Sequence, residues 1–165
     1  MRLAGVLLCW LLVSPWVLGQ AGRPELNPDV SPATLSSTIC VPGYTRTVRP
    51  GTAYTNAVKK RLMAAQGLDF DVERGRFELD HVVPLALGGH PSDPANLALQ
   101  PWDGPLSARR KDRLEVKLQC LVCSGALALD QAREEIWADW DAAFGRYGEM
   151  ACRRARSPAA PLDAE

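Results

Sequence analysis

The stretch ELDHVVPLALGGHPSDPANLAL, residues 78–99, determines what this chain can fold into. Residues 77–83 have the composition of a short strand. Pro84 and a Gly-Gly pair then turn the chain, and residues 97–99 supply a short second arm. The stretch therefore predicts a β-hairpin, and because a two-stranded hairpin is marginal by itself, helices must cover it.

Helical patterns lie on both sides of this hairpin. A first helix can start at residues 50–52 and end at Gly67, and a second has Ser107 as a good N-cap. A third begins with Asp130 as its cap. The order helix, β-hairpin, helix, helix predicts an α+β fold that is mainly helical. The apolar stripes are Tyr54, Val58 and Leu62 in the first helix, Leu114, Leu118, Leu121 and Val122 in the second, and Ile136, Trp137, Trp140, Phe144 and Tyr147 in the third.

The two ends of the chain differ in composition from the middle. Residues 1–19 have one charge, a short apolar run and small residues at the end, which is the pattern of a cleaved secretory signal peptide. We therefore expect a secreted or periplasmic protein with no membrane association after cleavage. Residues 20–38, rich in Pro, Ser and Ala, and residues 153–165 are predicted to be flexible. The domain itself is expected to span residues 39–152.

The charge balance limits the kind of partner. The chain has 19 basic and 19 acidic residues, and loss of Arg2 with the leader leaves a net charge of about −1. A nearly neutral protein does not coat nucleic acid through bulk charge, but a local basic surface stays possible.

Four cysteines follow the leader, namely Cys40, Cys120, Cys123 and Cys152. An even number in an exported chain favours two disulfides. Cys120 and Cys123 lie about one turn apart on a predicted helix, which places their Cβ atoms poorly for a mutual bond. We therefore prefer the pairs Cys40–Cys123 and Cys120–Cys152. The alternative is a zinc-binding or disulfide-exchanging Cys-x-x-Cys pair, although neither zinc-finger spacing nor a thioredoxin-like pattern surrounds it.

The residues that could carry out a reaction are concentrated in the predicted hairpin. Asp80-His81 is followed by Pro-Leu, the Gly-Gly turn, Asn96-Leu97 and a helix that starts near Ser107. This order and spacing resemble the HNH endonuclease family, in which a hairpin and a helix surround one divalent cation. The chain is also similar to secreted bacterial HNH nuclease-like proteins, in which a CVPGYT segment precedes the motif and a Val-Cys-x-Gly helix end follows it. The resemblance covers about residues 38–148. It implies a disulfide-stapled ββα-metal core and a metal-dependent endonuclease with little sequence preference.

Each residue of the motif has a role that the resemblance implies. Hydrolysis of a phosphodiester needs an activated water and an electrophile for the phosphate charge. His81, with an ordinary pKa near 6.5, can take a proton from water at neutral pH, and the resemblance makes it the general base. Asp80 would bind Mg²⁺ or Mn²⁺, and the amide of Asn96 would pin the loop. Because neighbouring strand residues face opposite sides, one centre for Asp80 and His81 requires a bend at the strand end.

The third position of the HNH pattern departs from the family. HNH proteins place His or Asn near the start of the helix as a further metal ligand, and the corresponding residue here is Ser107. A serine hydroxyl is a poor metal ligand but a good N-cap. Three outcomes follow: Asp80 and water hold the ion, another oxygen such as that of Asp103 replaces the ligand, or the centre is inactive. The alternative function is therefore an exported HNH-like protein that binds without cleaving.

A basic cluster marks the start of the same helix, formed by Arg109, Arg110, Lys111 and Arg113. Cations at a helix N-terminus oppose the macrodipole, so they cost stability there. A local cost without structural gain indicates function, and phosphate contact is the natural gain. The alternative is a solvated face. The expected partner is nucleic acid, DNA in preference to RNA, and the protein is expected to be a monomer.

Overall fold

The computed structural model describes residues 22–152. They form a mainly helical fold with one two-stranded antiparallel sheet, in which β1 (Phe77–His81) pairs with β2 (Leu97–Pro101). The signal peptide predicted at residues 1–19 and the tail predicted at residues 153–165 lie outside the described residues. In the described part, none of the helices has the length and apolar character needed to cross a membrane. The helices are α1 (Tyr44–Val48), α2 (Thr52–Ala65), α3 (Phe70–Glu73), α4 (Ala108–Cys123) and α5 (Leu129–Tyr147), with 3-10 turns at Leu35–Ser37, Arg74–Arg76, Leu85–Leu87 and Pro94–Asn96.

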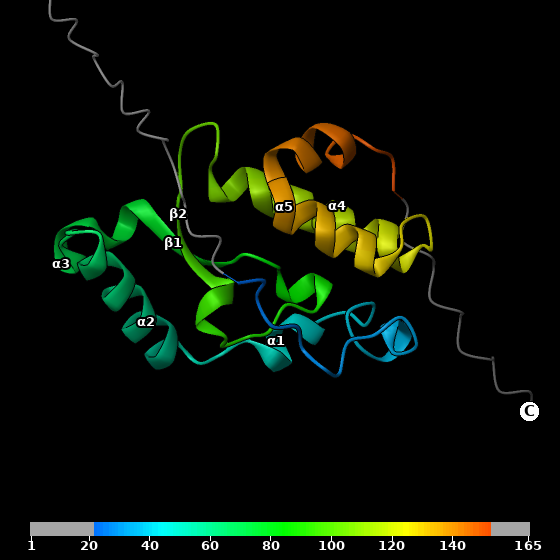
Figure 1. Ribbon diagram of the computed structural model, residues 1–165, viewed down its shortest axis with the longest axis horizontal. Coiled ribbons are helices and arrows are strands. Elements are labelled where there is room, and N and C mark those ends of the chain that lie inside the picture. The colour runs from blue at the N-terminus through cyan, green and yellow to red at the C-terminus, as the bar shows by residue number, and fades with distance from the viewer. Residues whose placement is uncertain (1–21, 153–165) are drawn as a thin grey trace, which may run out of the picture.

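The hairpin lies between two groups of helices. Figure 1 shows α2 and α3 on one side of β1 and β2, and α4 with α5 on the other. His81 is opposite Leu97 and Phe77 is opposite Pro101, so the hairpin is in register along its whole length. The ammonium of Lys59 in α2 donates to the carbonyl oxygen of Phe77 at 2.6 Å, which fixes α2 to the start of β1.

Element boundaries differ from the sequence-based prediction in three places. β1 ends at His81, because the chain bends at Val82 instead of continuing as a strand. β2 continues to Pro101 rather than ending at residue 99. α5 begins after Ala128, so the prediction of Asp130 as its cap is wrong. The carboxylate of Asp130 instead forms an ion pair with Arg133, one turn further along the helix.

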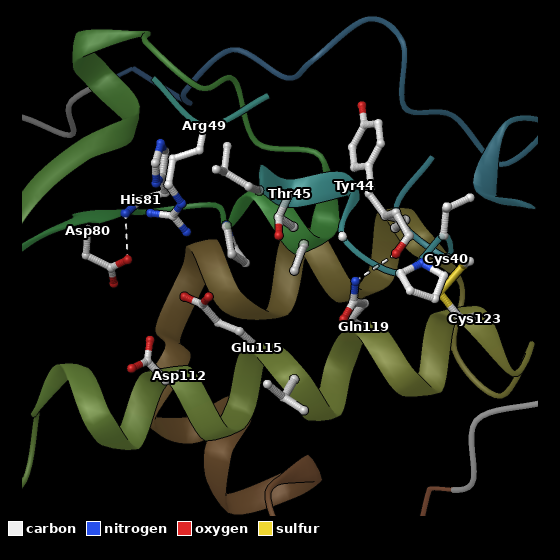
Figure 2. Close-up of a pocket in the computed structure, with 18 of the residues that line it drawn as sticks. Cys40, Tyr44, Thr45, Arg49, Asp80, His81, Asp112, Glu115, Gln119 and Cys123 are labelled. Carbon is white, nitrogen blue, oxygen red and sulfur yellow. Dashed lines mark hydrogen bonds between the residues drawn. A yellow bond between two sulfur atoms is a disulfide. The ribbon is translucent and has the colours of Figure 1, made fainter. Parts of the chain in front are cut away.

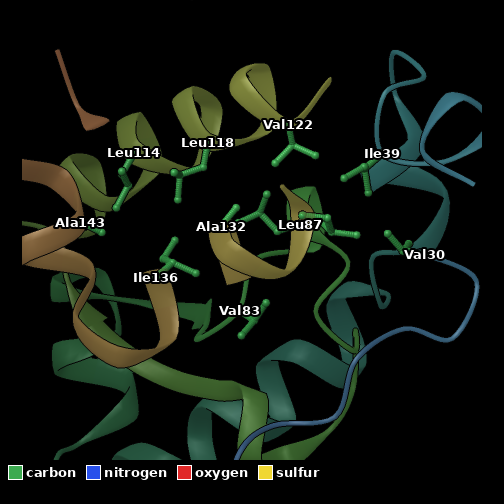
Figure 3. Packing of buried hydrophobic residues seen from close by; sticks show 11 residues of the cluster. Val30, Ile39, Val83, Leu87, Leu114, Leu118, Val122, Ala132, Ile136 and Ala143 are labelled. Carbon is green, nitrogen blue, oxygen red and sulfur yellow. The ribbon is translucent and has the colours of Figure 1, made fainter. Parts of the chain in front are cut away.

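The main hydrophobic core lies where α4 and α5 pack on the loop between the strands (Figure 3). The stripe predicted for α4 is confirmed, and Ile136 is the buried centre of the stripe predicted for α5. In α2 the prediction is partly wrong, because Val58 is buried but Tyr54 is 39% exposed and Met63 takes the inner position. The core side chains are Val30, Ile39, Val83, Leu87, Leu114, Leu118, Val122, Leu129, Ala132, Ile136 and Ala143.

Residues 22–38 are packed against the domain, so the prediction that this segment is flexible is wrong. The backbone N–H of Asn27 donates to the carbonyl oxygen of Gly88 at 2.9 Å. Val30 is buried in the core, and its carbonyl oxygen accepts from the guanidinium of Arg133 at 3.0 Å. The composition was misleading because the segment contains few apolar residues, yet those few reach the core.

Two disulfides attach α4 to segments that lie far from it in the sequence. Cys40 is bonded to Cys123 and Cys120 to Cys152, with Cα atoms 5.5 and 6.1 Å apart, so both preferred pairings are present. The first bond attaches the CVPGYT segment to the end of α4. Because the two cysteines of the Cys-x-x-Cys pair are bonded to different partners, this structure gives no support to the zinc-binding or disulfide-exchanging alternative.

Both residues of the Gly-Gly turn must be glycine, Gly88 because of its backbone conformation and Gly89 because there is no space for a side chain. Gly88 has a φ of 76°, in the left-handed region that favours glycine. A Cβ at Gly89 would lie 1.8 Å from the carbonyl oxygen of Val83 and 2.7 Å from Nδ2 of Asn96. The turn therefore lets the chain come close to the end of β1.

Substitution of Gly89 by alanine is expected to lower the free energy of unfolding by about 3 kcal/mol, because the added methyl group meets backbone that cannot give way. Urea denaturation measures the change. Gly75→Ala is the control, because a Cβ there has no atom within 4 Å and the residue has no positive φ. We expect the control to stay within about 1 kcal/mol of wild type, and equal losses in the two variants would contradict the close approach.

Candidate active site

Asn96 organises the loop between the two strands. Its side chain is fully buried, with 0% exposure. Oδ1 accepts from the backbone N–H of Val83 at 2.7 Å, and Nδ2 donates to the carbonyl oxygens of Val83 at 3.0 Å and His90 at 2.9 Å. One amide side chain therefore ties the chain that leaves β1 to the loop that precedes β2, and this fixes the backbone directly after His81.

His81, at the end of β1, is held in one tautomer. Its ring Nε2 lies 3.0 Å from the carbonyl oxygen of Pro91. Because a carbonyl oxygen only accepts, Nε2 carries the proton and Nδ1 carries the lone pair. The residue is 5% exposed, and this burial lowers the pKa of His81 below its ordinary value, although the Pro91 hydrogen bond and Asp80 oppose the shift. The imidazole is therefore neutral at neutral pH, with Nδ1 able to accept a proton.

Asp80 is buried and both of its oxygens have partners. Oδ1 accepts from the backbone N–H of His81 at 2.7 Å, and Oδ2 accepts from the ammonium of Lys111 at 2.8 Å. The ammonium also donates to the carbonyl oxygen of His81 at 2.7 Å and to Glu115 Oε1 at 2.5 Å. Burial opposes the charge on Lys111, but Glu115 and Asp80 outweigh it and raise the pKa of Lys111 above its ordinary value. Asp80 is thus joined to α4 through one buried cation.

The prediction that Lys111 contacts nucleic acid is therefore wrong. Lys111 is 2% exposed, and its three N–H groups are used inside the protein. A helical wheel would have placed it on the inner face, because Leu114 and Leu118 follow it at helical spacing. The i,i+4 spacing of Lys111 and Glu115 was a further signal of an ion pair.

A cavity of about 530 Å³ opens beside His81. Figure 2 shows Arg49 and His81 at one end of it and the Cys40–Cys123 disulfide at the other, with Asp112 and Glu115 projecting from α4. The charged lining comes from the segment after α1, from β1 and from α4, and consists of Arg49, Glu78, Asp80, His81, Asp112 and Glu115. The first disulfide therefore closes one wall of the cavity in which the candidate base lies.

The carboxylates in this cavity influence one another. Burial, with Asp80 and Asp112 adding to it, raises the pKa of Glu78 to about 7. Burial also raises the pKa of Glu115 to about 7, although Lys111 opposes the shift. The Oε2 atom of Glu78 is buried without a hydrogen-bond partner among the described residues. Glu78 is therefore able to hold a proton near neutral pH.

Arg49 is a functional candidate that sequence reasoning missed. It is exposed, it lines the cavity, and its guanidinium has no hydrogen bond or ion pair with the described residues, although its backbone N–H donates to the carbonyl oxygen of Thr45 at 3.1 Å. Its positive charge acts on His81, Glu78 and Asp112. Nothing in the sequence near Arg49 indicated this position, because the segment reaches the hairpin only through the fold and the Cys40–Cys123 bond.

The side chains around Asp80 do not fit the divalent cation that the resemblance implies. The two carboxylate oxygens already accept from a backbone N–H and an ammonium. Ser107 is the N-cap of α4 by position, but its hydroxyl makes no capping hydrogen bond and it does not line the cavity. The carboxylate of Asp103 is 89% exposed and lies 3.7 Å from Arg109 instead. In residues 22–152, no group of three or more His, Cys, Asp or Glu side chains is arranged to hold a metal ion.

The three arginines at the start of α4 contact aromatic rings outside the larger cavity. Arg110 forms an ion pair with Asp141 of α5 and lies over the ring of Phe144 at 4.3 Å. Arg113 lies over the same ring at 5.4 Å, and Arg109 lies over Trp102 at 5.8 Å. None of the three lines the cavity. Arg110 and Arg113 thus help to attach α4 to α5. The predicted phosphate-binding surface is wrong for the buried Lys111, whereas phosphate contact by the exposed Arg109 and Arg113 stays a prediction.

A smaller cavity of about 280 Å³ also contains Asp80 and His81 in its lining. Trp137 and Trp140 of α5 contribute to its wall. A break in the helical backbone at Asp139, with φ of −163° and ψ of 91°, separates these two tryptophans. The two cavities share the strand end that carries the candidate base.

The structure thus brings Asp80 and His81 to the lining of the same two cavities, with Asn96 fixing the loop that follows them. Both residues are paired in register with β2, and the chain bends directly after them, at Val82. Ser107 and the arginines of α4 stay outside the larger cavity. Comparisons of this chain with known protein families, with curated proteins and with solved structures found no match.

Proposed function

We propose that this protein hydrolyses phosphodiester bonds of nucleic acid, preferably DNA, in the cavity beside His81. The observation that carries the proposal is the state of His81, which is neutral and presents the lone pair of Nδ1. Arg49 supplies a cation in the same cavity, and its guanidinium has no hydrogen bond or ion pair with residues 22–152. A base for water and a positive charge for the phosphate are the two groups that this hydrolysis requires.

The proposed reaction uses only side chains of the cavity. Nδ1 of His81 takes a proton from a water molecule, and the oxygen of that water forms a bond to phosphorus. Arg49 binds the non-bridging phosphate oxygens, on which negative charge increases. Glu78, with its pKa raised to about 7, can give its proton to the leaving oxygen as the P–O bond breaks. The products are a phosphate monoester and an alcohol.

Other features of the chain agree with this proposal. A hairpin followed by a helix, formed by β1, β2 and α4, is the order of elements in the ββα core of the HNH family. The aromatic rings of Trp137 and Trp140 beside His81 can stack on nucleobases. Two disulfides suit a protein exported to an oxidising compartment.

The proposal is tested with the oxidised protein lacking residues 1–19, incubated with supercoiled plasmid, single-stranded DNA or RNA, in Mg²⁺, in Mn²⁺ and in EDTA. We expect nicking of the plasmid, with products of many different lengths because backbone contacts carry little sequence information. Binding of all three nucleic acids without cleavage of any would overturn the proposal and favour a binding protein that has lost catalysis.

Substitution of Arg49 by alanine is expected to lower the initial rate of plasmid nicking by about 100-fold, the usual effect of removing one group that stabilises transition-state charge. Arg49→Lys retains the charge and is expected to keep part of the rate. Arg46→Ala is the matched control, because Arg46 is an exposed arginine of α1 outside the cavity. Equal rates for Arg49→Ala and Arg46→Ala would contradict the role of Arg49.

A further inference from the structure

Lys111 lies at the point where the resemblance to HNH endonucleases implies a divalent cation. Its ammonium is surrounded by three oxygen atoms, which belong to Asp80 at 2.8 Å, to the backbone of His81 at 2.7 Å and to Glu115 at 2.5 Å. Two of these oxygens are carboxylate oxygens and the third is a carbonyl oxygen, so they are the ligand types that hard cations select. The position is therefore a cation site that the protein fills with its own side chain.

We propose that Lys111 is the resident cation of this site and that the protein acts without a divalent metal ion at Asp80. This inference rests on the proposed function, because it states how that hydrolysis proceeds. A metal ion on Asp80 would lie within a few ångströms of a buried ammonium, and like charges at that distance repel strongly where water does not screen them. Lys111 is 2% exposed, and moving its charge away from Asp80 would break all three hydrogen bonds of its ammonium.

Two tasks of a catalytic metal ion are divided between two side chains. A metal ion orients the groups of a site, and it also stabilises charge on the phosphate. Lys111 performs the first task, because it joins the end of β1 to Glu115 of α4 and so positions His81. It is a positioning residue, since its three N–H groups are used inside the protein and it lines only the smaller cavity, not the larger one that contains Arg49. Arg49 performs the second task, because it is the exposed cation in the cavity lining.

Removal of the ammonium should create a metal site. In Lys111→Ala, the carboxylates of Asp80 and Glu115 and the carbonyl oxygen of His81 would surround an empty space without a cation. Buried carboxylates that have lost their partner are unfavourable, and Mn²⁺ accepts oxygen ligands of this kind. We therefore expect Lys111→Ala to acquire an affinity for Mn²⁺ that the wild-type protein lacks.

The melting temperature in EDTA and in millimolar MnCl₂ tests this inference without relying on activity. The oxidised wild-type protein is expected to melt at the same temperature in both. Lys111→Ala is expected to melt lower than wild type in EDTA and to regain stability with Mn²⁺, whereas Lys111→Ala combined with Asp80→Asn should not respond. Lys60→Ala, which removes an exposed lysine of α2, is the matched control and should behave as wild type.

A rise in the wild-type melting temperature with Mn²⁺ that Asp80→Asn abolishes would overturn the inference. If Lys111→Ala folds only with Mn²⁺, that rescue supports it, and if the variant does not fold at all, the comparison of wild type with Asp80→Asn decides. Plasmid nicking gives a second readout: cleavage that persists in EDTA supports the inference, and cleavage that requires Mn²⁺ contradicts it. Absence of cleavage in every condition counts against the proposed function alone, because the melting temperatures still decide the role of Lys111.

Discussion

Substitution of His81 by alanine is expected to lower the initial rate of phosphodiester hydrolysis by about 100- to 10,000-fold, which is the usual contribution of a general base. The reason is that His81 lines the cavity and its Nε2 lies 3.0 Å from the carbonyl oxygen of Pro91, which leaves Nδ1 as the ring atom that can accept a proton. Initial rates of plasmid nicking measure the effect. The melting temperature of the variant, recorded beside the rate, separates loss of chemistry from loss of fold.

The second histidine of the chain provides the matched control for this substitution. Nδ1 of His90 accepts from the backbone N–H groups of Ser92 at 3.2 Å and Asp93 at 2.9 Å, so His90 holds a turn and does not line the cavity. His90→Asn keeps an acceptor for these N–H groups and is expected to retain most of the rate. Retention of the wild-type rate by a folded His81→Ala protein would rule out His81 as the base.

Substitution of Asn96 by alanine is expected to lower the free energy of unfolding by about 5 kcal/mol. The change removes three hydrogen bonds of a fully buried side chain and leaves the N–H and carbonyl of Val83 and the carbonyl of His90 without that partner. Each buried group left unsatisfied costs about 1–3 kcal/mol. Because a domain is typically stable by about 5–15 kcal/mol, much of the population should unfold. Urea denaturation followed by circular dichroism measures the loss.

Asn56→Ala is the control for this experiment. Asn56 is exposed in the middle of α2, where alanine is a better helix former, so the midpoint of unfolding should stay the same or rise slightly. A denaturation midpoint of Asn96→Ala that matches the midpoint of Asn56→Ala would show that the loop does not depend on the buried amide.

Local pattern was sufficient to predict part of the fold. The positions of the hairpin, the start of α4 after Ser107 and the inner face of α4 follow from strand, capping and helical periodicity signals over a few residues. The poor geometry of a bond between cysteines one turn apart excluded one of the three possible pairings, and the preferred one of the remaining two is present. The packing of residues 22–38 could not be predicted this way, because it depends on contacts with Gly88 and Arg133 far along the chain.

The residues of the candidate site were also predicted only in part. Asp80, His81 and Asn96 belong to one continuous motif, so the sequence identified them together. Within the basic cluster at the start of α4, the prediction did not assign helix faces, and Lys111 turns inward while Arg110 turns to α5. Arg49 was missed because its relation to His81 exists only in three dimensions.

Cleavage in water enriched in oxygen-18 tests most directly whether water, activated beside His81, breaks the phosphodiester bond. The wild-type protein is incubated with plasmid DNA in this solvent, and mass spectrometry then measures the terminal phosphate of the products. Hydrolysis predicts one oxygen-18 atom in each new terminal phosphate, and about 100- to 10,000-fold less labelled product from His81→Ala in the same time. Absence of cleavage by wild type, or products whose terminal phosphate carries no label, would contradict hydrolysis at this site.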